Sequence, residues 1–591
     1  IDKKIFYKIL SMLDHRGPDE KKIKSLNNVQ FGNTRLSIIG LNTPKSSLPI
    51  SDESFLLAYN GEIYNYKQLN DLLKKNNIKV EGRSDSETLF LLLKNFGIRK
   101  TLSLLDGMYA FCFYDKKNKK LYMARDKIGE RFLYWGMNKN KLLFSSEIKT
   151  IAKSGLIDAS PNLEDLKDYL ITSKIHGYKT FFKGIFEIEP GNFLTFDLEE
   201  KKYDTENFWK IENTFVNKDL KGIEGTLYKK LNQATTSRNI SDVPLCILYS
   251  GGIDSNALVD LSCNINKNKN LELFFADNYL ASFSEIENVI NGHKYLSEKY
   301  KKNNLILNTN KVTLDKYLEE IESLAWYYDE PIAFANSVLL DQLCSIMKNK
   351  GLKVSISGEG SDEIFFGYDK FVRTHYDFSK YKNNLENISI DKKIGLLYYG
   401  GGLHSLNTVN ELTNYNNISN EKDSIAWNWL KKNVNRNFDD LQLMYSQKFR
   451  LQLLLQRQDR VGMKNSIEIR TPYLAPELVA YVNSIPIAEK YNKHTNTTKF
   501  ILKKIFKNKI DDKIVHQEKT GFPSDMLSWI SENRMKTNII ELLTSNNSFS
   551  QNYLNGKSIK SILSSHYEGQ HNFSTLVWML YALEIWHKQF F

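Results

Sequence analysis

Short apolar runs separated by turn residues make up the first third of the chain. Their alternation of apolar and polar positions predicts strands at residues 33–39, 55–60, 108–115, 120–124, 142–145 and 191–196. A longer run with helical periodicity, residues 86–96, interrupts them. The pattern therefore predicts an α+β domain of packed sheets over residues 1–205.

The pattern changes at about residue 215, where longer helical stretches begin to alternate with apolar strands. Strands are predicted at residues 245–249, 271–276 and 353–357. This alternation is typical of an α/β domain with a parallel sheet, which we assign to residues 215–591. A polar, asparagine-rich stretch at about 380–440 is interpreted as an insertion of mixed helix and loop in that domain.

The strand at 245–249 runs into the turn Ser250-Gly251-Gly252-Ile253-Asp254-Ser255, after which a helix is expected to begin. Two glycines allow the backbone to approach a phosphate closely, and a helix N-terminus supplies oriented N–H donors. Ser250 and Ser255 add hydroxyls, and Asp254 is suited to hold Mg²⁺. These features indicate an ATP pyrophosphate site; the alternative is a plain Gly-Gly turn with a serine N-cap.

The strand at 353–357 also ends in an acidic, glycine-rich turn, Gly358-Glu359-Gly360-Ser361-Asp362-Glu363. The C-terminal ends of parallel strands share one crevice, so we expect the two turns to face each other. Carboxylates beside phosphates require a cation, which makes Asp254 and Asp362 the predicted magnesium ligands. Glu359 would remain free to act as a base or to orient the acceptor.

Composition narrows the class of protein. The chain has 591 residues, 41% of them hydrophobic, which suffices for more than one core. The net charge of +12 is spread through Lys- and Asn-rich segments without an RNA motif or recognition helix, so we expect no nucleic-acid partner. No apolar run is long enough to span a bilayer and no signal peptide opens the chain, so we expect no membrane partner and a cytoplasmic location.

The cysteines add no chemistry of their own. Four are present, widely spaced in apolar surroundings: Cys112, Cys246, Cys263 and Cys344. This spacing fits reduced, buried thiols and indicates neither a metal cluster nor a disulfide framework.

Further motifs make the chain resemble the glutamine-hydrolysing asparagine synthetase family. Its ATP-pyrophosphatase motif matches residues 250–255, and its SGEGSDE segment matches residues 357–363 letter for letter. Residues 457–463 and 466–475 resemble its LRxDRxSM and SxExRxPFLD stretches, where Gly462 and Ala475 depart from the usual Ser and Asp. Two later stretches of this chain resemble the family's late segments: Thr498-Lys499 and Lys519-Thr520-Gly521-Phe522. Gln517 stands where the family usually has an arginine.

The resemblance implies ATP and Mg²⁺ as cofactors and assigns roles in the rear domain. Lys519 falls at an active-site lysine that would neutralise charge when ammonia displaces AMP, and Glu359 is the second predicted catalytic residue. The predicted ATP- and pyrophosphate-binding residues are Leu248, Ser250, Gly251, Gly252, Asp254, Ser255, Ala276, Ser357 and Gly358.

The front of the chain follows the family's glutaminase domain in order, through residues 15–19, 34–39, 60–65, 84–87, 124–126 and 144–149. The resemblance implies a layered αββα fold of the N-terminal-nucleophile type. By this resemblance Arg35 would pair with the glutamine carboxylate, while Glu62 and Asp85 would hold its α-amino group. Asn60 and the Gly61 N–H would form the oxyanion hole. Taken singly, these positions are ordinary turn or cap residues; the joint pattern favours the site.

The family's nucleophile is a cysteine at the first position of the mature chain, whereas residue 1 here is isoleucine. Two explanations remain open. Either the sequence begins after the true N-terminus, or the chain is a relative without glutaminase activity, as the β-lactam synthetases resemble the family without the cysteine. The retained Arg35, Asn60, Glu62 and Asp85 favour the first.

The predicted function is ATP-dependent synthesis of asparagine from aspartate through an aspartyl-adenylate, with ammonia taken from glutamine. A related amidotransferase acting on another carboxylate, in polysaccharide or secondary-metabolite assembly, is the first alternative. A catalytically silent scaffold homologue is the second, against which Asp254, Glu359, Asp362 and Lys519 argue. A homodimer is what the resemblance implies.

Overall fold

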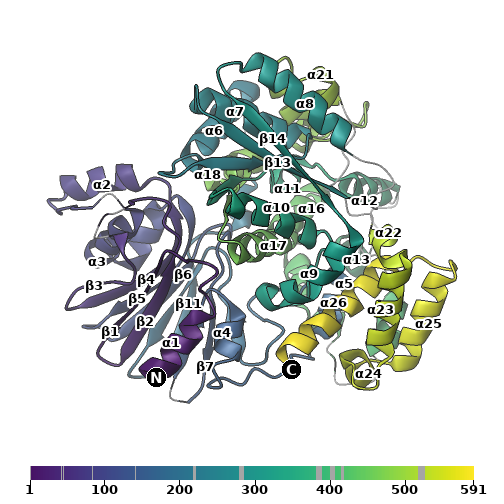
Figure 1. Ribbon diagram of the computed structural model, residues 1–591, viewed down its shortest axis with the longest axis horizontal. Helices are drawn as coiled ribbons and strands as arrows, with labels where there is room; N and C mark the ends of the chain where they lie inside the picture. The colour runs from purple at the N-terminus through teal and green to yellow at the C-terminus, as the bar shows by residue number, and fades with distance from the viewer. Residues whose placement is uncertain are drawn as a thin grey trace.

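A computed structural model of the chain describes residues 2–41, 43, 46–82, 84–139, 141–216, 221–278, 285–380, 389–398, 406–413, 418, 420–516 and 526–591. Figure 1 shows two parts side by side: N-terminal antiparallel sheets, drawn in purple and blue, and a larger part that contains a parallel sheet and most of the helices. The predicted combination of α+β and α/β architecture is confirmed.

The N-terminal part is built on a six-stranded antiparallel sheet of order β11-β10-β6-β5-β4-β3. Its strands are β3 (Ile50–Ser51), β4 (Phe55–Ile63), β5 (Gly107–Asp115), β6 (Lys120–Arg125), β10 (Asn192–Asp197) and β11 (Lys202–Asn207). A second layer holds the ladder β1 (Glu20–Leu26) with β2 (Val29–Arg35) and the sheet β8-β7-β9, formed by β7 (Tyr134–Met137), β8 (Leu142–Ser145) and β9 (Ile185–Glu187).

Side-chain alternation in the central strands holds the layers together. Tyr59 and Phe111 point to one face of the large sheet and pack on α2 (Tyr66–Lys75) and α3 (Asp85–Leu104). Ala58 and Cys112 point to the other face and pack against the second layer. Helix α4 (Ile148–Ala152) packs on β7, β8 and β9, and α1 (Lys3–Ser11) packs on β2. The order helix, sheet, sheet, helix is the αββα arrangement that the resemblance implied.

The larger part contains a five-stranded parallel sheet of order β14-β13-β12-β15-β16. Its strands are β12 (Leu245–Leu248), β13 (Leu271–Asn278), β14 (Leu305–Val312), β15 (Val354–Ile356) and β16 (Glu468–Arg470). Because β12 lies between β13 and β15, the turns that follow β12 and β15 leave the same edge of the sheet side by side.

Helices surround the parallel sheet and fill the C-terminal part. They are α5 (Leu166–Thr172), α6 (Ile223–Arg238), α7 (Ile253–Ile265), α8 (Ile286–Lys299), α9 (Leu314–Tyr328), α10 (Ser337–Asn349), α11 (Ser361–Phe365), α12 (Asp369–Lys380), α13 (Ile390–Tyr398), α14 (Leu406–Thr413), α15 (Ile425–Asn433), α16 (Phe438–Tyr445), α17 (Leu451–Lys464), α18 (Pro476–Asn483), α19 (Ile487–Lys490), α20 (Phe500–Phe506), α21 (Asp512–His516), α22 (Met526–Ser531), α23 (Asn533–Thr544), α24 (Phe549–Tyr553), α25 (Gly556–Tyr567) and α26 (Ser574–Phe590). Among the helices of the described ranges, none is both long and apolar enough to cross a bilayer.

Most predicted elements are found, with local differences. The strand predicted at 33–39 is β2, which begins earlier and leaves its ladder after Arg35 because its partner β1 begins opposite that residue, at Glu20. The helix predicted at 86–96 is the first part of α3, which bends at Gly97. Within 380–440, the described residues form helices α13 to α15 and the start of α16, in part on a small apolar core of their own around Trp427.

Candidate active sites

The two predicted turns meet at the carboxyl edge of the parallel sheet. The Ser361 hydroxyl, at the start of α11, donates a 2.7 Å hydrogen bond to Asp254 Oδ1 at the start of α7. A Cβ on Gly358 would lie 3.2 Å from the Asp254 Cβ, so the turns are in contact. The hydroxyls of Ser250 and Ser255 lie 3.3 Å apart at the mouth of the first turn. The structure therefore brings the predicted phosphate-binding groups together around one crevice.

Three of the predicted ATP-binding residues, Leu248, Ala276 and Ser357, lie on or next to the strands that border this crevice. Leu248 is the last residue of β12, and Ser357 follows β15 directly. Ala276 lies two positions beyond Phe274, the last residue of β13 that pairs with β12, and its side chain is fully buried.

Glu359 has a partner that was not predicted. Its carboxylate accepts a 2.5 Å hydrogen bond from Arg457 Nη2, on helix α17. The other side of the same guanidinium donates to Asn336 Oδ1 at 2.9 Å. We expected a free carboxylate; a guanidinium at this distance fixes its direction. This contact suits Glu359 to orienting a substrate.

Lys519, the predicted catalytic lysine, lies outside the described residues. Another lysine from a late motif, Lys499, reaches the crevice. Its Nζ lies 2.5 Å from Asp254 Oδ2 and 2.7 Å from Asp362 Oδ1. Burial alone would lower the pKa of Lys499, but these two carboxylates raise it above its usual value. Both predicted magnesium ligands therefore converge on one point.

The oxygen ligands at this point fit Mg²⁺. Asp254 and Asp362 present oxygen ligands of the kind that Mg²⁺ takes, together with substrate phosphates and water. Among the described residues, no cluster of three or more His, Cys, Asp or Glu side chains suited to a metal occurs. The pair therefore fits an ion that arrives with a nucleotide rather than one caged by protein groups alone.

The predicted glutamine-binding residues border one cavity of about 670 Å³ in the N-terminal part. The lining includes Arg35, Asn60, Gly61, Glu62 and Asp85. Its wall also includes residues of the larger part, among them Glu468 on β16. All five predicted residues are thus brought together, at a place where the two parts of the chain meet.

Two carboxylates of this cavity are deeply buried. Asp85 Oδ2 accepts hydrogen bonds from the Tyr59 hydroxyl at 2.6 Å and from the Ile63 N–H at 3.0 Å. Glu62 Oε2, by contrast, is buried without a hydrogen-bond partner among the described residues. Burial raises the pKa of Glu62 well above its usual value, Asp85 and Glu468 raise it further, and Arg470 opposes them. An orphaned buried carboxylate oxygen is suited to receive a ligand cation.

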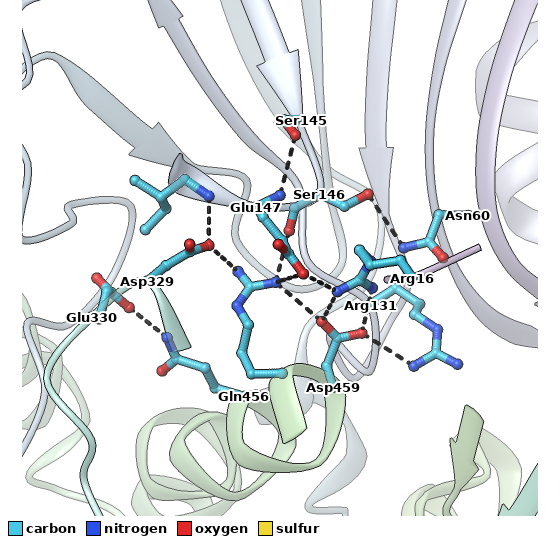
Figure 2. A network of polar contacts seen from close by, with 12 residues as sticks. Arg16, Asn60, Arg131, Ser145, Ser146, Glu147, Asp329, Glu330, Gln456 and Asp459 are labelled. Carbon is cyan, nitrogen blue, oxygen red and sulfur yellow. Dashed lines mark hydrogen bonds and ion pairs between the residues drawn. The ribbon is translucent and has the colours of Figure 1, made fainter. Parts of the chain in front are cut away.

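A buried ion-pair network joins the two parts, as Figure 2 shows. Asp459, on α17, accepts two 2.9 Å hydrogen bonds from Arg16 and one of 3.3 Å from Arg131, both in the N-terminal part. Burial alone would raise the pKa of Asp459, but Arg16, Arg460 and Arg131 hold it below its usual value. Arg460 Nη1 donates to the Ser146 carbonyl at 2.9 Å, and the Asn60 amide lies 3.4 Å from the Ser146 hydroxyl. One helix therefore contacts Glu359 at Arg457 and the glutamine cavity region at Arg460.

The departure at Gly462 has a packing explanation. A Cβ on Gly462 would lie 2.6 Å from the Ile467 carbonyl oxygen, because α17 packs directly against that backbone. Ala475 is buried at the N-cap of α18, which begins with Pro476. Nothing in the structure explains the departure at Ala475.

Restoring the family's serine at position 462 should destabilise this chain. Gly462→Ser forces a side chain against the Ile467 carbonyl, and overpacking of this kind costs about 1–3 kcal/mol. The urea-unfolding midpoint measures the loss. Gly225→Ser is the matched control, because a Cβ at that helical glycine meets nothing within 4 Å. Equal midpoints for the two variants would contradict this reading of Gly462.

Sequence reasoning missed Arg457, Asp459, Arg460 and Lys499 as site or interface residues. All four lie in motifs that were recognised, but the motifs give no partners. The sequence expectation for the thiols is confirmed, since Cys112, Cys246, Cys263 and Cys344 are free and buried.

Comparison with known proteins agrees with this geometry. Residues 226–588 match the family model described as asparagine synthase, and residues 2–209 match a glutamine amidotransferase domain. Asparagine synthetase [glutamine-hydrolyzing] 1 of Bacillus subtilis is 26% identical over 98% of this chain and 92% of its own length. Asparagine synthetase [glutamine-hydrolyzing] 3 of the same organism is 27% identical over 88% and 84%. Amidase chry2 of Gibberella zeae is 26% identical over 88% and 85%. With its family model covering more than half of its length, the chain belongs to the asparagine synthase family.

Proposed function

We propose that this chain synthesises asparagine from aspartate, using ATP and ammonia released from glutamine. The observation that carries the proposal is the convergence of Asp254, Asp362 and Glu359 at the ends of two adjacent parallel strands. Such an edge is where α/β sheets bind nucleotides. The cavity around Glu62 and Asp85 supports the glutamine half of the reaction.

The chemistry proceeds in two steps. An oxygen of the acceptor carboxylate attacks the α-phosphorus of ATP, the α–β bridging P–O bond breaks, and pyrophosphate leaves. Ammonia then attacks the carbonyl carbon of the acyl-adenylate, AMP leaves with the bond electrons, and the nitrogen loses a proton. Mg²⁺ bound with ATP would neutralise the charge of the phosphates.

This chain's own groups have assigned parts in that reaction. The N-terminus of α7 and the hydroxyls of Ser250 and Ser255 would hold the phosphates. Asp254 and Asp362 would hold the cation. Glu359, fixed by Arg457, would orient the acceptor or the incoming ammonia.

A second acceptor class has support of its own. The amidase relative and the first asparagine synthetase are both 26% identical to this chain, over 88% and 98% of its length. The crevice chemistry would serve any carboxylate that fits, so an amide synthetase for another carboxylate is the alternative function.

Release of pyrophosphate from ATP, with ammonium chloride as nitrogen donor, distinguishes these functions. We expect release that depends on aspartate. Turnover only with a different carboxylate would replace aspartate while keeping the mechanism. No turnover with any acceptor would favour a silent homologue.

The glutamine site is tested by Arg35→Ala. The Arg35 side chain borders the cavity and donates to the Ile39 carbonyl at 3.2 Å. Loss of a charge-assisted contact to the substrate carboxylate costs about 1.5–3 kcal/mol, or roughly 10- to 150-fold in glutamine affinity. Ammonium-driven turnover should be unchanged, and its loss would refute the domain assignment. Isothermal titration calorimetry and pyrophosphate release measure the two quantities.

Glutamine binding should release protons. The α-ammonium of glutamine favours ionised Glu62, whose pKa is raised in the free cavity, so binding lowers that pKa and expels a proton. Affinity then rises with pH until Glu62 is ionised in the free protein. Calorimetry in buffers of different ionisation enthalpy detects the proton, and Glu62→Gln should abolish it. A binding enthalpy that is independent of buffer would contradict this role for Glu62.

An additional strand in the glutamine cavity would supply the nucleophile. The cavity runs between strands β2 and β8, and in the described part of the chain β8 pairs only with β7, while β2 pairs with β1 apart from one bridge at Arg35. On β2, the buried side-chain amide oxygens Oε1 of Gln30 and Oδ1 of Asn33 have no hydrogen-bond partner among the described residues. An inserted strand would pair with both edges and bring a terminal cysteine to Asn60 and Gly61.

If the encoding DNA continues upstream of Ile1, adding those residues tests this part of the proposal. The extended protein should hydrolyse glutamine, and replacing its terminal cysteine by serine should abolish hydrolysis. If the extension leaves glutamine intact, the chain belongs with the relatives that lack glutaminase activity.

A further inference from the structure

Lys499 is a buried lysine held in an unusual backbone conformation. It precedes helix α20 with φ of +53°, in the left-handed region, and is 2% exposed. Non-glycine residues are held there only when their surroundings require it, and such residues cluster at functional sites. The side chain runs into the nucleotide crevice and ends between Asp254 and Asp362.

The backbone beside the Lys499 side chain leaves room for it only because residue 367 is glycine. A Cβ on Gly367 would lie 1.9 Å from Asp362 Oδ1 and 2.3 Å from Lys499 Cε, so only glycine fits beside the ammonium stem. Asp254 Oδ1 is held separately by the Ser361 hydroxyl, which leaves Oδ2 facing Lys499 Nζ at 2.5 Å. The carboxylates are 18% and 15% exposed, so water compensates their charge only in part.

We propose that Lys499 occupies the position of the divalent cation in the nucleotide-free protein and makes metal binding depend on ATP. This inference rests on the proposed function of the crevice. One ammonium placed between two carboxylates neutralises part of their charge and leaves no room for a second cation at the same point. A divalent ion that binds without nucleotide therefore gains little binding free energy.

Binding of the triphosphate changes the net charge of the crevice. It brings several negative charges to the crevice, so the ion and the ammonium are both compensated when they are present together. The flexible lysine stem allows Nζ to leave the carboxylate pair and contact phosphate oxygens. Lys499 would thus couple binding of the metal ion to binding of the nucleotide, so that the ion does not occupy the crevice without ATP.

Binding of Mn²⁺ measured by electron paramagnetic resonance tests the inference without turnover. The wild-type chain without nucleotide should bind Mn²⁺ no more tightly than about 1 mM, and a non-hydrolysable ATP analogue should create a tight site. Lys499→Met should bind Mn²⁺ alone at least about 10-fold more tightly than wild type, a difference of about 1.4 kcal/mol. Divalent ion should also raise the melting temperature of Lys499→Met more than that of wild type.

Two further variants make the result specific. Lys507→Met removes an exposed lysine at the end of the same helix and should leave Mn²⁺ binding as in wild type. Lys499→Met combined with Asp254→Asn should lose the gained site. If Lys499→Met does not fold, Lys499→Gln serves in its place, since it also removes the charge.

Tight Mn²⁺ binding by the nucleotide-free wild type would overturn the inference, as would a folded Lys499→Met or Lys499→Gln with wild-type Mn²⁺ affinity. Either outcome leaves the proposed function standing if wild type still releases pyrophosphate. Failure of the proposed function would instead appear as no pyrophosphate release with any acceptor, whatever the Mn²⁺ result.

Discussion

Asp459→Ala should lower the stability of the chain by about 3–5 kcal/mol, the usual cost of removing one partner from a buried ion pair. Asp459 is the carboxylate shared by Arg16, Arg131 and Arg460, which are all buried. Its removal takes one compensating charge away from these buried guanidinium groups, although Glu147 still pairs with Arg16 and Glu468 with Arg131. The urea-unfolding midpoint and the melting temperature measure the loss.

An exposed pair provides the control for this prediction. Asp52 and Lys94 lie 2.7 Å apart, but their side chains are 30% and 42% exposed. Lys94→Ala removes this pair but keeps the hydrogen bonds that Asp52 accepts from the Ser54 and Phe55 N–H groups, so it should change stability by no more than about 1 kcal/mol. If Asp459→Ala were no more destabilising than Lys94→Ala, the network of Figure 2 would not hold the two parts together. Asp459→Asn, which keeps the shape but removes the charge, should fall between the two.

The crevice was predictable because its geometry follows from short stretches of sequence. Asp254 and Asp362 each follow a recognisable buried strand, and parallel strands end at one edge, so their meeting required no knowledge of packing. Arg35, Asn60, Glu62 and Asp85 were placed by resemblance, and the cavity brings them together. For these residues, local pattern and topology contain the needed information.

Partners supplied by distant segments were not predictable. Arg457 reaches Glu359, and Lys499 reaches Asp254, only because α17 and the start of α20 pack beside turns far away in the chain. Periodicity says which face of a helix is buried, but not which charged group it meets. The position of Asp459 between the two parts depends likewise on how the antiparallel and parallel sheets are placed relative to each other.

Asp362→Asn should abolish adenylation, with pyrophosphate release reduced by about 100- to 1000-fold, the range seen when one group that stabilises developing charge is removed. The substitution removes a full negative charge at the point where Asp254 and Asp362 converge, so the cation that accompanies ATP loses one of its two predicted protein ligands. The side chain keeps its size beside Gly367, where space is tight. The effect should therefore be chemical rather than steric, and circular dichroism should match wild type.

Two comparisons decide whether the loss belongs to the adenylating crevice. Asp369→Asn, an exposed aspartate at the start of α12, should keep wild-type pyrophosphate release with ammonium chloride. Glutamine affinity of Asp362→Asn should be unchanged, because that ligand is assigned to the separate cavity bordered by Glu62 and Asp85. A folded Asp362→Asn that retains more than about a tenth of wild-type release would show that this carboxylate supplies less than about 1.4 kcal/mol to the transition state. Asp362 would then not be a metal ligand, and Asp254 would have to hold the cation without it.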